Sequence, residues 1–206
     1  HVYYSCSAFG KNTSAIGVAT TPTLNPNSPD YKWTDHGKVI QSVPNRDMWN
    51  AIDPNIIIDE EGTPWMNFGS FWDGIKMVKL SPDMKSVDQP EEWVSLCRRE
   101  RSFELDDANP GDGAVEAPFI MKHGDYYYLF VSFDYCCRGK DSTYKVVVGR
   151  SKTVKGPYLD KEGKRMDKGG GSLVIEGTEG WAGIGHNSAY HFDGKDYFIC
   201  HAYSLA

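Results

Sequence analysis

Short apolar runs separated by turn residues dominate the pattern along this chain. Val, Ile, Tyr and Phe gather in these runs, and Gly, Asn, Asp and Pro stand between them. Apolar residues at helical spacing are nearly absent. Runs of this composition bounded by turn residues are typical of β-strands. The pattern therefore predicts an all-β protein.

The runs repeat in the same order in three units, which start at Ala51, Ala114 and Gly183. Each unit has an apolar strand, a turn that contains glycine and an aromatic strand. The first two units continue into a third strand that ends in serine, IKMVKLS and YKVVVGRS. Consecutive antiparallel units of this kind are typical of a β-propeller, in which each unit is one blade.

The two ends of the chain match only parts of the repeat. The stretch HVYYSCSAFGKNTSAIGVATT resembles a second and a third strand, whereas HAYSLA stops where a second strand ends. We expect one propeller domain over 1–206, with full blades at about 50–82 and 113–160 and partial blades at 1–22 and about 172–206. A further chain segment or a second polypeptide would complete the ring. Long segments such as TPTLNPNSPDYKW and SLCRRERSFELDDANPGDGA are expected to be surface loops.

A titratable residue stands near the start of each first strand. Counted back from the turn glycines Gly62, Gly124 and Gly194, these residues are Asp53, Glu116 and His186, at nine, eight and eight positions. First strands line the centre of a propeller, so we expect the three side chains to occupy equivalent positions and to converge there. Any one of them alone is more simply a turn or structural residue. Their shared position favours a functional site.

Glu116 has the features of a general acid. It lies in the apolar stretch AVEAPFI, and apolar surroundings favour the protonated form of a carboxyl group. A protonated carboxyl near neutral pH is what acid catalysis requires. Glycoside hydrolysis uses two carboxylates with distinct duties, which in inverting enzymes stand roughly 6.5–9.5 Å apart.

Composition narrows the choice of ligand. The net charge is −6 and no basic run occurs, which argues against nucleic acid and anionic membranes as partners. No apolar stretch approaches the roughly 18 residues of a membrane span. The aromatic share of 13% suits a sugar ligand, although most of these rings are expected to fill a β core.

The five cysteines match no zinc-binding spacing. A dense disulfide framework is not expected, because the number is odd. The adjacent pair Cys136 and Cys137 allows two free thiols or a strained vicinal disulfide, and we favour free thiols.

Three stretches resemble the arabinanases of glycoside hydrolase family 43: IDPNIIIDEEGTPWMNFGSFWDGI, EAPFIMKHGDYYYLFVSFDYCCRGKDSTYKVVVGRS and GIGHNSAYHFDGKDYFICHAY. The resemblance extends over essentially the whole chain. It implies a five-bladed β-propeller that cleaves α-1,5-linked L-arabinan or arabino-oligosaccharides with inversion, using three carboxylates. Arabinan lies outside cells, so a secreted or periplasmic location is expected.

The resemblance also implies roles for individual residues. Glu116 matches the general acid, Asp53 the aspartate that tunes and orients the acid, and His186 the ligand of a central, largely water-coordinated calcium ion. Substrate contacts are implied for Asn50, Ser70, Trp72, Cys136, Arg138 and Phe9, with Trp72 as a stacking platform. The catalytic base of the family would fall before residue 1, so we expect it outside this chain.

Several functions fit these observations. An inverting endo-arabinanase is the preferred interpretation, and an exo-arabinanase is the nearest alternative. An arabinofuranosidase or xylosidase of the same family comes next, followed by a non-catalytic carbohydrate-binding propeller fragment. A metal-dependent phosphoesterase fits poorly, because neither a carboxylate cluster nor basic phosphate contacts are evident.

Overall fold

The computed structural model describes residues 1–102 and 109–206. Strands account for the regular structure of this part, together with two single-turn 3₁₀ helices at Gly139–Asp141 and Met166–Lys168. The prediction of an all-β protein is therefore confirmed. Among the described residues, no helix has the length and apolar character needed to cross a membrane.

The strands form four antiparallel sheets that follow one another along the chain. The first sheet has the order β1-β2-β3, with strands Val2–Cys6, Ser14–Thr20 and Thr34–Ser42. The second has the order β4-β5-β6-β7, with strands Asn55–Ile58, Pro64–Phe68, Ile75–Lys79 and Trp93–Cys97. The third contains β8 to β11, with strands Val115–His123, Tyr126–Phe133, Lys145–Ser151 and Ser172–Ile175. The fourth pairs β12, Trp181–Phe192, with β13, Lys195–Ser204.

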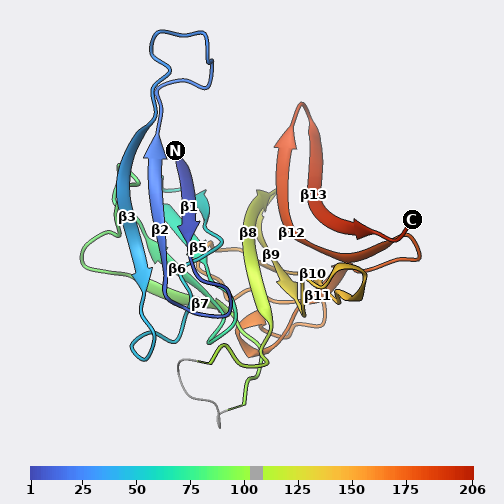
Figure 1. Ribbon diagram of the computed structural model, residues 1–206. Helices are drawn as coiled ribbons and strands as arrows, with labels where there is room; N and C mark the ends of the chain where they lie inside the picture. The colour runs from blue at the N-terminus through green and yellow to red at the C-terminus, as the bar shows by residue number, and fades with distance from the viewer. Residues whose placement is uncertain (103–108) are drawn as a thin grey trace.

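The first strands of successive sheets lie next to one another. β8 contacts β4 of the sheet before it and β12 of the sheet after it. In Figure 1 the lime-green β8 stands in the middle, with β1 to β3 on one side and the red β12 and β13 on the other. This arrangement brings the starts of β4, β8 and β12 together, although they are far apart in sequence.

Two apolar cores hold the sheets together. One lies between the second and third sheets and includes Trp65, Ile75, Leu129 and Val131, and the other joins the first and second sheets. Tyr144, by contrast, is buried against Gly185 of β12. The third sheet is therefore packed on both sides, so that the start of β8 is firmly positioned.

The predicted blade limits are wrong at their outer strands. β3, β7 and β11 each add an outermost strand to a sheet, and β11 pairs with β10 rather than belonging to the last unit. β3 exposes one edge and much of its surface, and it lacks a long apolar run, reading TDHGKVIQS. The segment from Ser95, which we expected to be a loop, begins inside β7, and its residues 103–108 lie outside the described residues.

Candidate active site

An irregularity stands near the start of β4, β8 and β12. The pairing register shifts between Glu116 and Phe119 in β8 and between Gly185 and Ser188 in β12, which marks a β-bulge. At each place one residue other than glycine takes a positive φ: Asp53, two residues before β4, at 57°, Ala117 in β8 at 54° and His186 in β12 at 49°. Left-handed conformations at such residues are strained and gather at functional sites.

The bulges correct the predicted equivalence of the three titratable residues. Asp53 and His186 are equivalent, but their counterpart in β8 is Ala117, and Glu116 is the counterpart of Gly185. Counting from glycines failed because Gly124 is the first residue of its two-residue turn, whereas Gly194 is the second. Glu116 therefore lies one position before the residue that is equivalent to Asp53 and His186. Because successive residues of a strand point in different directions, its side chain is not equivalent to theirs.

Hydrogen bonds from the bulge residues tie each sheet to the preceding one. The N–H of Asp53 donates to Ser5 Oγ at 3.3 Å, and the N–H of His186 donates to Ser132 Oγ at 2.9 Å. Between them, the N–H of Ala117 donates to Asp53 Oδ2 at 3.2 Å. The carboxylate of Asp53 therefore fixes the backbone directly after Glu116.

Two hydroxyl groups hold the carboxylate of Glu116. Ser70 Oγ donates to Oε2 at 2.7 Å, and the Tyr144 hydroxyl donates to Oε1 at 2.8 Å. Both donors are buried, with exposed fractions of 4% for Ser70 and 1% for Tyr144. The apolar surroundings expected for Glu116 are therefore incomplete, because each of its oxygens meets a polar donor. We call Asp53, Ser70, Glu116 and Tyr144 the acid site.

Asp53 has a strongly perturbed acidity. Burial and the negative charge of Glu116 raise the pKa of Asp53 to about 7, against the smaller opposing effect of the Ala117 N–H. Asp53 can therefore hold a proton near neutral pH.

His186 lies beside this pair and next to a second histidine. Burial lowers the pKa of His186, although the charge of Glu116 opposes the effect. Its ring centroid lies 5.6 Å from that of His201 in β13. Calcium prefers six to eight oxygen ligands, and residues 1–102 and 109–206 contain no group of three His, Cys, Asp or Glu placed to hold a metal. The expected site consists of one histidine with a shell of waters, so the calcium ion stays a prediction.

Several residues predicted to contact substrate have other surroundings. Ser70 supports Glu116, as described above. Asn50 is 4% exposed and accepts a hydrogen bond from Ser14 Oγ at 2.6 Å. Trp72 is 2% exposed and cannot offer a ring face for stacking, so that prediction is wrong. Phe9 is 94% exposed on the β1–β2 loop, and its role as a pocket wall stays a prediction.

A partly exposed aromatic group lies beside the acid site. Phe71 directly follows Ser70, its N–H donates to Val115 O at 2.8 Å, and its ring lies 6.0 Å from that of Tyr135. The guanidinium of Arg138 lies 4.2 Å from the Tyr135 ring centroid. We call Phe71, Tyr135 and Arg138 the aromatic rim. The family resemblance implied a substrate contact for Trp72, but the local turn buries Trp72 and leaves its neighbour Phe71 partly exposed.

The cysteine pair next to this rim is oxidised. Cys136 and Cys137 form a vicinal disulfide, contrary to the expectation of free thiols. Spacing alone could not decide between the two states, because it carries no information on redox conditions. The disulfide makes a compact apolar surface between Tyr135 and Arg138.

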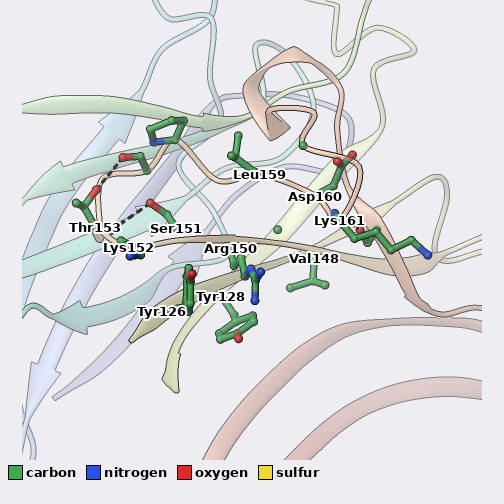
Figure 2. Close-up of a pocket in the computed structure, with 15 residues that line it drawn as sticks. Tyr126, Tyr128, Val148, Arg150, Ser151, Lys152, Thr153, Leu159, Asp160 and Lys161 are labelled. Atoms are coloured by element: carbon green, nitrogen blue, oxygen red, sulfur yellow. Dashed lines mark hydrogen bonds between the residues drawn. The ribbon is translucent and has the colours of Figure 1, made fainter. Parts of the chain in front are cut away.

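A separate hollow of ≈ 880 Å³ lies on the outer part of the third sheet (Figure 2). Tyr126 and Tyr128 line it, but Arg150 covers the Tyr126 ring at 4.4 Å from its centroid. The carboxylate in the hollow, Asp160, is engaged by the N–H groups of neighbouring loop residues. This hollow therefore lacks a free carboxylate pair, and the acid site remains the candidate for chemistry.

The acid site defines the class of protein. A carboxyl group oriented by two hydroxyls, beside a second carboxyl whose pKa burial raises, is suited to the acid role in glycoside-bond hydrolysis. The sequence profile described as Glycosyl hydrolases family 43 matches residues 1–206. The chain belongs to this family.

Known relatives share most of the sequence of this chain. The extracellular exo-α-(1→5)-L-arabinofuranosidase ArbA of Cellvibrio japonicus (strain Ueda107) is 60% identical over 206 residues, which are 100% of this chain and 59% of that protein. The extracellular endo-α-(1→5)-L-arabinanase 1 of Bacillus subtilis (strain 168) is 45% identical over 89% of this chain and 52% of that protein. The chain thus spans less than two thirds of the length of either relative.

A solved structure has nearly the same backbone. The α-L-arabinanase of Cellvibrio cellulosa, complexed with arabinohexaose, superimposes with a TM-score of 0.96 and 60% sequence identity. The match covers 98% of this chain and 64% of that chain.

Proposed function

We propose that the protein containing this chain is an inverting glycosidase that hydrolyses α-1,5-linked L-arabinan. The observation that carries the proposal is the pair Asp53 and Glu116, placed together near the starts of β4 and β8 in a family 43 chain. Both relatives described above are named for action on α-1,5-linked arabinose polymers. Those relatives are also named extracellular, and we propose secretion for this protein too.

In the proposed mechanism Glu116 is the general acid. Its proton would pass to the glycosidic oxygen as the bond to the anomeric carbon breaks, while water attacks from the opposite face. Ser70 and Tyr144 would aim the carboxyl group, and their bonds would stabilise the carboxylate that remains after proton transfer. Asp53 would hold the strand in place directly after Glu116, through the N–H of Ala117.

We propose that the four sheets are blades of a five-bladed propeller and that the catalytic base lies outside residues 1–206. The side-by-side arrangement of β4, β8 and β12 supports radial packing of the sheets. A base that activates water must face Glu116 across the substrate, with room for that water between the two groups. The part of the ring outside this chain would provide it.

The products released from linear arabinan distinguish exo cleavage from endo cleavage. Exo action has the better support, because the relative that is 60% identical is an exo-acting enzyme and the endo-acting one is 45% identical. We expect the complete protein to release one short product from the start of the reaction, measured by chromatography, with little early fall in viscosity. A rapid fall in viscosity with a ladder of products would instead support the endo-arabinanase predicted from the sequence. If neither products nor reducing ends appear, the proposed function is wrong.

We propose that the aromatic rim contacts the arabinose units. Tyr135→Ala should raise KM for linear arabinan about tenfold, or about 1.4 kcal/mol, with little change in kcat, because a stacking ring binds ground and transition states alike. Tyr31→Ala is the control, since Tyr31 is a 40% exposed tyrosine in the β2–β3 loop. Equal KM values for the two variants would remove the rim from the binding site.

A further inference from the structure

Tyr144 is the residue of the acid site that no sequence motif indicated. It lies just before β10, in the third sheet, and its hydroxyl reaches Glu116 Oε1 at 2.8 Å although the two residues are 28 positions apart. The whole side chain is buried, with 1% exposed. A buried hydroxyl without a partner costs free energy, so this hydrogen bond also fixes the ring.

The neighbouring sheet is shaped to receive the Tyr144 ring. A Cβ atom at Gly185 of β12 would lie 2.0 Å from Tyr144 Cδ1, so only glycine leaves room there. Gly185 is the counterpart of Glu116 in the fourth sheet, as the bulge register establishes. The position that carries the Glu116 side chain in the third sheet therefore carries no side chain in the fourth sheet. The Tyr144 ring, which supports Glu116, packs against this glycine.

Tyr144 keeps its proton under all ordinary conditions. Burial, together with the charge of Glu116, raises the pKa of Tyr144 well above that of a free tyrosine. The hydroxyl is thus a permanent donor to the Glu116 carboxylate. A donor to the charged form favours ionisation, whereas Asp53, as a negative neighbour, opposes it.

We propose that Tyr144, seated on Gly185, is a positioning residue that sets the orientation and proton affinity of the general acid Glu116. The inference rests on the proposed function, since it assigns a support to the acid of that same reaction. Ser70 holds the other oxygen, so the carboxyl group is fixed from two sheets: the second through Ser70 and the third through Tyr144.

The test is Tyr144→Phe in the complete protein, with Gly185→Ala as a second variant. Phe keeps the ring but removes the donor, and Gly185→Ala displaces the ring. We expect kcat for linear arabinan to fall about tenfold, as for loss of a hydrogen bond to a charged group, with KM nearly unchanged. The alkaline limb of the kcat/KM profile should move to higher pH by about 0.5–1 unit, because the protonated form of the acid is favoured. Gly185→Ala should move the limb in the same direction.

Tyr158→Phe is the matched control. Tyr158 is equally buried, with 1% exposed, but its hydroxyl donates to Val154 O at 2.7 Å, outside the acid site. Its removal should leave the pH profile unchanged. The inference fails if Tyr144→Phe gives the profile of the unmodified protein, or if Tyr158→Phe shifts the limb to the same extent.

A second readout does not depend on turnover. The side-chain carboxyl of Glu116 can be followed by ¹³C NMR during a pH titration, and its midpoint should be higher in Tyr144→Phe than in the unmodified protein. Absence of arabinan cleavage by the unmodified protein would overturn the proposed function but leave this measurement intact. An unchanged midpoint would overturn the role of Tyr144, whatever the activity.

Discussion

Glu116→Gln should abolish nearly all hydrolysis of linear arabinan by the complete protein. Gln has the shape of Glu and keeps one oxygen to accept a hydrogen bond from Ser70 or Tyr144, while its NH₂ group can donate to the other hydroxyl, but it carries no acidic proton. A positioned general acid contributes about 10²–10⁴-fold to rate, and we expect a loss in this range in kcat. The release of reducing ends measures it.

Binding separates the loss of chemistry from the loss of structure. Calorimetric titration with arabinohexaose should give similar dissociation constants for Glu116→Gln and the unmodified protein. Glu92→Gln is the control, because Glu92 forms a surface ion pair with Lys155 at 2.8 Å; exposed pairs of this kind contribute little. Comparable activity losses in the two variants would show that Glu116 has no special role.

Asp53→Asn should lower activity and, at neutral pH, stabilise the fold. The pKa of Asp53 is raised from 3.8 to about 7, so the folded state binds its proton more tightly than the unfolded state does. The folded state is therefore penalised progressively as pH rises through that interval, and Asn removes the penalty. The variant should gain on the order of 2–4 kcal/mol at pH 8 relative to the unmodified protein, and almost nothing at pH 4.

Urea unfolding at pH 4, 6 and 8 measures this difference. Asp59→Asn is the control, because we expect its effect on stability to have the opposite sign. Burial raises the pKa of Asp59, but hydrogen bonds from Trp65 and from the N–H of Thr63 outweigh it and lower the pKa. Its ionised form therefore stabilises the fold, and Asn should destabilise the protein more at pH 8 than near pH 3. A stability gain in Asp53→Asn that does not change with pH would contradict the assigned acidity.

Activity of Asp53→Asn should fall by about 10²-fold, because the charge beside Glu116 is lost. The Asn side chain can still accept the Ala117 N–H, so the strand itself should remain in place. Circular dichroism of the variant should therefore match that of the unmodified protein. Full activity would show that Asp53 acts on structure alone.

Local pattern was sufficient to predict the inner strands of the sheets. The runs around Ile56, Tyr127 and Val147 lie in β4, β9 and β10, where apolar side chains pack between sheets. The outer strand β3 was missed because an edge strand can carry polar residues and needs no apolar run, whereas β11 was assigned to the wrong sheet. Hydrogen bonding to a neighbouring strand decides which sheet such a strand joins, and a single sequence does not show this pairing.

From the residue pattern alone, the only site residues that could be predicted were those that stand near the start of each repeated unit. Asp53, Glu116 and His186 emerged from their shared position, but the one-residue offset of Glu116 depends on bulges that counting from glycines does not register. Tyr144 supports Glu116 through a contact between distant segments, and nothing in its local sequence indicates that contact. Phe71 and Trp72 are adjacent aromatics whose exposure is decided by left-handed backbone at both positions.

The central claim is that Glu116 gives a proton to the leaving group, and the most direct test compares two leaving groups. A 4-nitrophenyl arabino-oligosaccharide releases an anion that needs no proton, whereas linear arabinan releases a sugar hydroxyl that does. We predict that Glu116→Gln loses about 10²–10⁴-fold in kcat/KM on linear arabinan but stays within about tenfold of the unmodified protein on the aryl substrate. Equal losses on the two substrates would contradict the assignment of Glu116 as the general acid.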